Sequence, residues 1–361
     1  MFKLPLRYVV LLLALLMVML SGCSQKPSSL HYDSMGASDQ VVWPAPPEIP
    51  RYRFVGQLTG DENFLSDENN KPFFAVRAFR WLVGLVAGKE IPQGLQRPQT
   101  GMVGADGRIY VTDVSRQAVA VFDIEAGEFV FWEDASPNMR FLSPIAIAEG
   151  ANNEILVTDS KWAMVVRLDS KGTPLGSFGS DVLKQPTGIA RDAESGVIYV
   201  ADTHGHDIKV FSDQGELLRS FGIKGEAQGQ FNSPTHMAFR DGVLYVADTM
   251  NARVQMFDRD DKPIRTFGRR GLFVGNMPRP KGVTIDNNGL IYVVESYHDY
   301  LLIFNDQGEF LMPIGGTGHG VGQFYLPAGV WSDNNNKVYV ADMFNGRVVV
   351  FEFLGEMGHE S

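Results

Sequence analysis

The sequence predicts an all-β protein, a six-bladed β-propeller built from four-stranded antiparallel blades. A short apolar run that ends in an acidic residue recurs six times, and the acidic residues lie 43 to 47 positions apart. Each interval holds short apolar stretches separated by turn residues, which is the pattern of one propeller blade. A single such sheet cannot bury both of its faces, so six units must stack around a common axis. The acidic residues are Asp113, Asp159, Asp202, Asp248, Glu295 and Asp342.

Residues 186–234 show the blade pattern most clearly. A Pro and a small apolar run come first, a polar turn follows, and residues 197–201 then form a near-continuous apolar strand that ends at Asp202. A third strand is expected at 208–211 and a fourth at 217–221, with turn residues between them. The four strands together make one antiparallel meander.

The first 22 residues resemble a secretion signal rather than part of the propeller. Lys3 and Arg7 give a basic start, and the apolar residues 9–20 are fewer than the ~20 that a membrane-spanning helix needs. The next residues, Leu-Ser-Gly-Cys ending at Cys23, resemble the lipobox of bacterial lipoproteins, in which the Cys carries the lipid. Cys23 is the only cysteine, so we expect a lipid-anchored envelope protein without disulfides. The alternative is an ordinary N-terminal anchor with an incidental cysteine.

The segment 23–50 is polar and then Pro-rich, and we expect a flexible tether between the lipid and the propeller. Ser24 after the lipid-bearing Cys resembles lipoproteins that are sorted to the outer membrane. The whole chain has a formal charge of −10, and residues 1–22 hold two basic residues and no acid, so the remainder carries −12. This balance argues against nucleic acid as a partner, because phosphate binding depends on basic side chains.

The two ends of the chain are expected to close the ring. After Asp342 only one further strand follows, at residues 347–353, so the last blade lacks its fourth strand. Arg53-Phe54-Val55-Gly56 matches the fourth strands of inner blades, such as residues 219–222. We therefore predict that the propeller domain, residues 51–361, is closed by this N-terminal strand, which removes an exposed sheet edge.

Two repeated features suggest chemistry but favour a structural interpretation. Residues 315–320 are Gly-rich like a phosphate-binding loop, yet three copies with the same offsets each lead into another strand, which indicates interblade turns. Six carboxylates, one per blade, could be imagined as a metal ring. A position repeated in every blade more often performs a repeated task, and we expect each carboxylate to cap a turn by accepting backbone N–H groups.

Residues 60–97 interrupt the repeat between a fourth strand and a first strand. Pro72 suits the first position of a helix, and residues 73–87 are predicted to form a helix that ends at Gly88. The helix is apolar nearly all round and must be covered by the propeller, by a partner's groove or by a membrane surface. We expect a lid on the propeller. The candidate lid or partner residues are Phe74, Arg77, Phe79, Arg80 and Trp81.

The blade motif resembles that of the NHL-repeat family of six-bladed propellers. The residues that carry the resemblance are Asp248-Thr249-Met250-Asn251-Ala252-Arg253 and Asp342-Met343-Phe344-Asn345-Gly346-Arg347. The resemblance covers residues 51–361 less the insertion, and it implies a binding platform as the usual role, with enzymes a minority. The blades that end at Asp159, Asp202 and Glu295 depart from the motif because they lack its Arg.

Two kinds of loop share one face of such a propeller, which we call the loop face. They join the second strand to the third, and the fourth strand to the next blade. The other turns lie on the opposite face, the turn face. Most histidines map to the loop face or to the channel mouth, so ligand or partner contacts are expected there. The candidate residues are His204, His206, His236, Lys281, Tyr297, His298 and His319.

Two function hypotheses follow from these features. The first is a lipid-anchored scaffold that binds an envelope protein or a small ligand through the loop face, with no cofactor besides the lipid on Cys23. The second is a hydrolase or lyase with a metal in the channel, as in the related six-bladed lactonases and amidating lyases. Neutral imidazoles bind zinc well, but only His236 is expected in the channel. Its equivalents in the other blades are Gly101, Ala146, Gly188, Gly282 and Gly329.

We therefore expect no metal site and no catalytic residues, and we favour the scaffold over the enzyme. Electron transfer finds no support within the chain, because a haem attachment motif needs two cysteines and Cys23 is alone.

Overall fold

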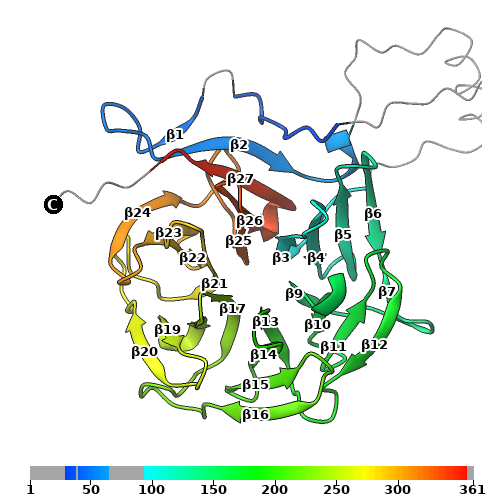
Figure 1. Cartoon of the computed structure of the whole chain (residues 1–361). Helices are drawn as coiled ribbons and strands as arrows, with labels where there is room; N and C mark the ends of the chain where they lie inside the picture. The colour runs from blue at the N-terminus through cyan, green and yellow to red at the C-terminus, as the bar shows by residue number, and fades with distance from the viewer. Residues whose placement is uncertain (1–28, 38–39, 65–92, 356–361) are drawn as a thin grey trace, which may run out of the picture.

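Six β-sheets stand around a central channel like the blades of a propeller (Figure 1). The structure is a computed structural model that describes residues 29–37, 40–64 and 93–355. Neighbouring strands within each blade are antiparallel, and the first strand of each blade lies innermost, against the first strands of the two adjacent blades. The predicted fold class, six four-stranded blades, is confirmed.

The first five blades follow one another along the chain. The first blade holds β3 (Pro98–Val103), β4 (Ile109–Asp113), β5 (Ala118–Asp123) and β6 (Glu128–Trp132), and the second holds β9 (Pro144–Glu149), β10 (Ile155–Asp159), β11 (Met164–Leu168) and β12 (Pro174–Phe178). A two-stranded hairpin, β7 (Asp134–Ser136) and β8 (Met139–Arg140), lies between them in sequence. The third holds β13 (Pro186–Asp192), β14 (Val197–Asp202), β15 (Asp207–Ser212) and β16 (Leu217–Phe221). The fourth holds β17 (Pro234–Arg240), β18 (Val243–Asp248), β19 (Arg253–Phe257) and β20 (Pro263–Phe267), and the fifth holds β21 (Pro280–Ile285), β22 (Ile291–Glu295), β23 (Tyr300–Phe304) and β24 (Phe310–Gly315).

The position of a strand in its blade explains its composition. Second strands such as β10 and β22 are buried along their whole length because other blades cover both of their faces. Such strands are near-continuous apolar runs rather than alternating patterns. Outer strands such as β12 and β16 are half-exposed, and their sequences are accordingly mixed. The core therefore lies between the blades, as six apolar clusters around the ring.

The sixth blade joins the two ends of the described chain. It holds β25 (Val330–Ser332), β26 (Lys337–Asp342) and β27 (Arg347–Phe353), with β2 (Tyr52–Leu58) as the outer strand. β2 pairs antiparallel with β27, with Phe54 opposite Phe351 and Gln57 opposite Val349. The predicted closure by the N-terminal strand is confirmed.

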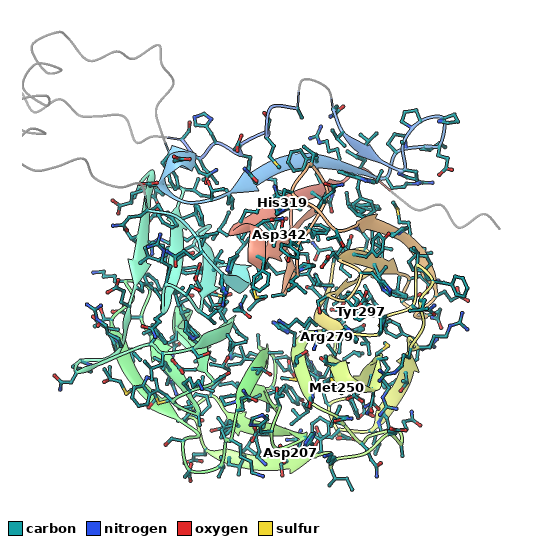
Figure 2. All side chains as sticks on the ribbon, turned by 180° about the vertical axis from the view of Figure 1, so that it is seen from behind. Asp207, Met250, Arg279, Tyr297, His319 and Asp342 are labelled. Atoms are coloured by element: carbon teal, nitrogen blue, oxygen red, sulfur yellow. The ribbon has the colours of Figure 1, made fainter. Side chains whose placement is uncertain are left out.

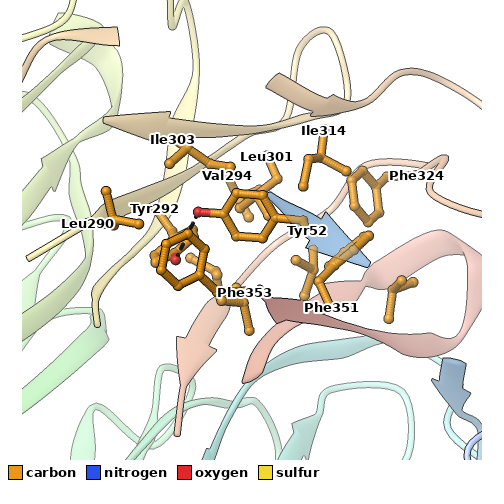
Figure 3. Packing of buried hydrophobic residues seen from close by; sticks show 14 of the residues in the cluster. Tyr52, Leu290, Tyr292, Val294, Leu301, Ile303, Ile314, Phe324, Phe351 and Phe353 are labelled. Carbon is orange, nitrogen blue, oxygen red and sulfur yellow. Dashed lines mark hydrogen bonds between the residues drawn. The ribbon is translucent and has the colours of Figure 1, made fainter. Parts of the chain in front are cut away.

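Side chains of β2 reach across to the fifth blade (Figure 3). Tyr52 is fully buried, and its hydroxyl lies 3.1 Å from the hydroxyl of Tyr292 on β22. The two rings meet edge to face, with centroids 6.2 Å apart. Phe351 and Phe353 of β27 belong to the same cluster. The ring is therefore closed both by the pairing of β2 with β27 and by the packing of these aromatic side chains in the core.

Part of the segment predicted as a tether contacts the propeller. β1 (Val42–Trp43) pairs with β2 and gives the sixth blade a fifth strand. The Trp43 ring packs edge-on against Phe351, 5.4 Å between centroids, and Asp33 pairs with Gln57. Residues 29–37 and 40–50 therefore also contact the propeller, so the folded region begins N-terminal to the predicted boundary at residue 51.

The six acidic residues have the capping role predicted for them. All six are fully buried. The Asp159 carboxylate accepts backbone N–H groups of Leu142 and Ser143 from one loop, and of Lys161 and Trp162 from the other. Asp113, Asp248, Glu295 and Asp342 likewise join the loop before the blade to the loop between the second and third strands, through backbone N–H groups or, for Asp248 and Asp342, an Asn side chain of the second loop. Asp202 accepts the backbone N–H groups of Lys184 and Gln185 from the loop before its blade.

The NHL-like Asn and Arg extend this bonding in two blades. Arg253 pairs with Asp248 and donates to the carbonyl oxygens of Glu226, Ala227 and Gln230 in the Gly-rich interblade loop. Two of these carbonyls accept a second hydrogen bond, Ala227 from the backbone N–H of Gln230 and Gln230 from the side-chain amide of Gln255, so several donors hold the loop together. The blades that lack the motif Arg use other hydrogen-bond donors. In the second blade the indole of Trp162 donates to the carbonyl of Arg140.

The predicted helical insertion is only partly described. Its ends are η1 (Asp61–Phe64), a single turn of 3-10 helix, and residues 93–97, joined by a bridge between Gly60 and Gly94. The other 3-10 turns are η2 (Ala151–Asn153), η3 (Thr249–Asn251) and η4 (Met343–Asn345). The predicted helix 73–87, with Phe74, Arg77, Phe79, Arg80 and Trp81, lies outside the described residues. Along the described ranges, no helix is long and apolar enough to cross a membrane.

Candidate functional site in the central channel

Two cavities open on the channel that the innermost strands line. The larger, about 600 Å³, lies among the first strands and the turns that follow them, on the turn face, and we call it the turn-side cavity. The smaller, about 350 Å³, lies among the loops of the fourth to sixth blades, on the loop face, and we call it the loop-side cavity. The loop-side cavity is lined by Ser233, Thr249, Met250, Arg279, Lys281, Ser296, Leu326 and Met343.

Glycines allow the innermost strands to approach one another closely. A Cβ atom added at Gly188 would lie 2.2 Å from the carbonyl oxygen of Thr235. One added at Gly329 would lie 2.4 Å from the carbonyl oxygen of Gln99. Because both obstacles are backbone atoms, a larger side chain does not fit at either position. The equivalent position of the fourth blade, His236, carries the large side chain at this level of the channel.

His236 is buried in the wall of the turn-side cavity without a hydrogen-bond partner. The residue is 6% exposed, and neither ring nitrogen makes a hydrogen bond within the described chain. Burial and, less strongly, the charge of the nearby Lys281 lower the pKa of His236 to about 3, against an opposing effect of the Lys281 backbone. The imidazole is therefore neutral at physiological pH, with one N–H to donate and one nitrogen to accept.

Trp331 presents a second buried polar atom without a partner. Its indole stacks on Tyr339, with centroids 5.5 Å apart, and covers Gly101, where an added Cβ would lie 2.6 Å from the ring. The Nε1 atom makes no hydrogen bond within the described residues, and the side chain lines the turn-side cavity together with His236. Buried polar groups normally have partners, so His236 and Trp331 are two exceptions in the wall of one cavity.

Arg279 and Lys281 converge on the loop-side cavity. Lys281 is the second residue of β21 and Arg279 directly precedes the strand, so the two occupy alternate positions and share one side of the chain. Within residues 29–37, 40–64 and 93–355, no carboxylate forms an ion pair with either side chain. Burial and, less strongly, the charge of Arg279 together lower the pKa of Lys281 to about 8.

The nearest blade carboxylate is already engaged. Glu295 is fully buried and accepts the backbone N–H groups of Arg279, Tyr297 and His298 at 2.9–3.1 Å. It also contacts the Nδ1 atom of His298 at 3.0 Å. The fold thus holds the two cations in place through backbone contacts and gives neither of them a counter-charge.

The other predicted residues lie at several places around the loop face. Tyr297 is 61% exposed and follows the lining residue Ser296. His298 occupies the position that Asn has in the NHL-like motif, which suits its contact with Glu295. Tyr297 and His298 meet edge to face at 4.8 Å. These residues flank the cavity rather than fill it.

The remaining histidines are more peripheral. The Nδ1 atom of His206 accepts the backbone N–H of the lining residue Ser233, and His204 is exposed on the same loop as His206. His319 is exposed, contacts Asn345 and stacks edge-on against Tyr325. Figure 2 shows Arg279 beside the channel and His319 over the sixth blade, away from it. The structure thus brings together His236 and Lys281, with Tyr297 and His298 near them.

Sequence reasoning missed two residues of this site. Arg279 was overlooked because it stands in an interblade loop, although Arg279-Pro280-Lys281 places a basic residue on each side of the Pro that begins a blade. Trp331 was overlooked because a Trp in an innermost strand resembles an ordinary core residue. The large side chain of Trp331 could have indicated the site, because it follows Gly329 by two positions in a segment where small residues predominate.

Comparisons with known proteins agree with the observed geometry. A family model of the NHL repeat matches residues 183–211, and a family model described as a 6-bladed beta-propeller matches residues 278–360. The chain is therefore a six-bladed β-propeller that carries an NHL repeat. No curated protein matches the chain.

Several solved structures share this fold. Virginiamycin B lyase from Staphylococcus aureus is 14% identical with a TM-score of 0.53, over 72% of this chain and 96% of the lyase chain. A gluconolactonase from Xanthomonas campestris is 15% identical with a TM-score of 0.54, over 72% and 87% of the two chains. An auxiliary nutrient binding protein from Bacteroides ovatus is 13% identical with a TM-score of 0.56, over 72% and 70%. At these identities the likeness is one of fold.

Proposed function

We propose that this protein is a lipid-anchored propeller of the bacterial cell envelope that binds a small ligand or a partner protein at the loop face, around the mouth of the central channel. The lipobox-like sequence that ends at Cys23 supports the anchor, and Ser24 supports the outer membrane as its location. The acidic balance of the chain argues against nucleic acid as the partner.

The observation that carries the proposal is the loop-side cavity at the mouth of the channel, where neither Arg279 nor Lys281 has a carboxylate partner within the described residues. His236 has two free ring nitrogens, and it lies close enough to Lys281 for that charge to lower its pKa. His236 lines the turn-side cavity and Lys281 lines the loop-side cavity. An incoming ligand would satisfy polar groups that otherwise remain buried without partners. The nutrient binding protein from Bacteroides ovatus supports a binding role on this fold.

The second candidate is a metal-dependent lyase or hydrolase. It is favoured by His236 on the channel and by the fold shared with virginiamycin B lyase and gluconolactonase. The residues present do not fit a metal centre. Among the residues that the structure describes, no three His, Cys, Asp or Glu side chains converge, and the close strand contacts at Gly188 and Gly329 leave no room for additional ligands there. Binding is the better supported function.

The proposal predicts that one face of the propeller captures its partner in the cell. A photo-crosslinking amino acid at Tyr297, exposed on the loop face, is compared with one at Asp241, whose side chain is 93% exposed on the turn face. In cells that produce the lipidated chain, light is expected to form a discrete adduct at Tyr297 alone, and its mass distinguishes a protein from a small molecule. Equal adducts at both positions, or adducts only at Asp241, would contradict the proposal.

A further inference from the structure

We propose that the loop-side cavity binds a small molecule with two negative charges, a phosphate monoester or a dicarboxylate, between Arg279 and Lys281. The inference rests on the proposed binding function and names the chemical class of its ligand. The cavity has room for a molecule of this size, about 350 Å³.

The first argument is that these two cations lack, within the described chain, the carboxylate partner that the NHL-like Arg residues of the neighbouring blades have. Arg253 and Arg347 are paired with the buried carboxylates of Asp248 and Asp342, at 2.8 Å each. Arg279 and Lys281 line a cavity of their own, and no acidic side chain of the described chain pairs with them. They stand on either side of Pro280 and line the same cavity.

The second argument concerns the free energy of this arrangement. Two like charges at neighbouring positions repel, and partial burial of Lys281 removes its charge from water without a counter-charge to compensate it, while Arg279 remains exposed. The lowered pKa of Lys281 reflects both effects. A bound dianion would reverse them, because it supplies opposite charge to both side chains. Arg is suited to bidentate contact with a phosphate or carboxylate, and Lys acts as a point charge.

The third argument is that the surroundings of Lys281 offer no other charge partner. The neutral His236 ring lies toward the turn-side cavity, and Glu295 is occupied by backbone N–H groups. The other lining residues are uncharged: Ser233, Thr249, Met250, Ser296, Leu326 and Met343. The amine of Lys281 is therefore the titrating group, and anion affinity should fall as the pH rises through about 8, where Lys281 loses its proton.

The test measures binding of inorganic phosphate and of succinate to the full chain by titration calorimetry, at low salt and neutral pH. Arg279→Gln and Lys281→Gln are each expected to weaken binding at least about tenfold. Lys161→Gln is the matched control, an exposed lysine on the loop face of the second blade, and should leave the affinity unchanged. Neither site residue forms an ion pair, so both variants should retain the thermal stability of the parent.

Proton uptake provides a second readout. Binding to the parent chain at pH 8 should take up protons and weaken toward pH 9.5, whereas binding to Lys281→Gln should show no such pH dependence. Preference for one of the two anions identifies the acidic group of the ligand. No binding of either anion, or binding unchanged in both variants, would overturn the inference. A Tyr297 crosslink that forms while no anion binds would leave the binding function standing and remove only this ligand class.

Discussion

Replacing Arg347 with Met is expected to lower the free energy of unfolding by about 3–5 kcal/mol. Arg347 is 4% exposed, and its Nε atom lies 2.8 Å from the carboxylate of Asp342, which is fully buried. Burial already raises the pKa of Asp342, so removal of the guanidinium would leave an uncompensated buried acid. The same guanidinium donates to the carbonyl oxygens of His319, Gly320 and Gln323. The variant would lose all three hydrogen bonds, and only the Gly320 carbonyl would keep another donor in the described chain, the backbone N–H of Gln323.

The matched control is Arg140→Met. Arg140 also pairs with an acid, Glu133 at 2.9 Å, but its side chain is 72% exposed. Exposed pairs contribute at most about 1 kcal/mol, so this variant should unfold at nearly the denaturant concentration of the parent. Chemical denaturation of the three proteins measures the difference. If Arg347→Met costs no more than Arg140→Met, the NHL-like Arg is not what holds the interblade loop.

Removing the closing strand should have the largest effect on folding. A chain that begins at residue 59 lacks β2 and with it the buried side chains of Tyr52, Phe54 and Leu58. Truncation of one large core side chain costs about 2–5 kcal/mol, and a typical domain has only about 5–15 kcal/mol in total. It also exposes the edge of β27, a row of unpaired backbone groups that favours aggregation. The shortened chain should be insoluble or unfolded.

The control is a chain that begins at residue 40, which loses the contacts of residues 29–37 but keeps β1 and β2. Its circular dichroism and melting temperature should stay close to those of the parent. A chain from residue 59 that melts with the control would show that the ring does not depend on the pairing of its two ends.

The architecture could be predicted from the sequence because every blade repeats the same buried second strand and the same capping carboxylate. The acidic residue at the end of each second strand can be located by eye, since it ends a run buried on both faces and caps two loops. The match between Arg53-Phe54-Val55-Gly56 and inner fourth strands predicted β2 and its pairing with β27. These features depend on local pattern and repetition, which a single sequence records.

Features that occur only once could not be predicted in the same way. β1 is two residues long in a Pro-rich segment, and its contact is made by Trp43 against a strand more than 300 positions later. The β7–β8 hairpin interrupts one interblade loop without a counterpart in the others. No period indicates such elements, since they are determined by tertiary contacts rather than by propensity.

The candidate site was predicted in part. The channel position of His236 followed from blade alignment, and the structure adds that its ring lacks partners. That Lys281 and Arg279 are unpaired could not be inferred, because it depends on Glu295 being engaged by three backbone N–H groups. Which charges remain free is a property of the folded loops.

The central claim is that the channel of this propeller binds a ligand and does not hold a catalytic metal. The most direct test is the metal content of protein purified from the cells that produce it, without chelators, measured by elemental mass spectrometry for the parent and for His236→Gln. We expect zinc, calcium and iron to be well below one atom per chain and equal in the two proteins. One atom of a single metal per chain in the parent, lost in His236→Gln, would contradict the account and place the protein among metal-dependent enzymes.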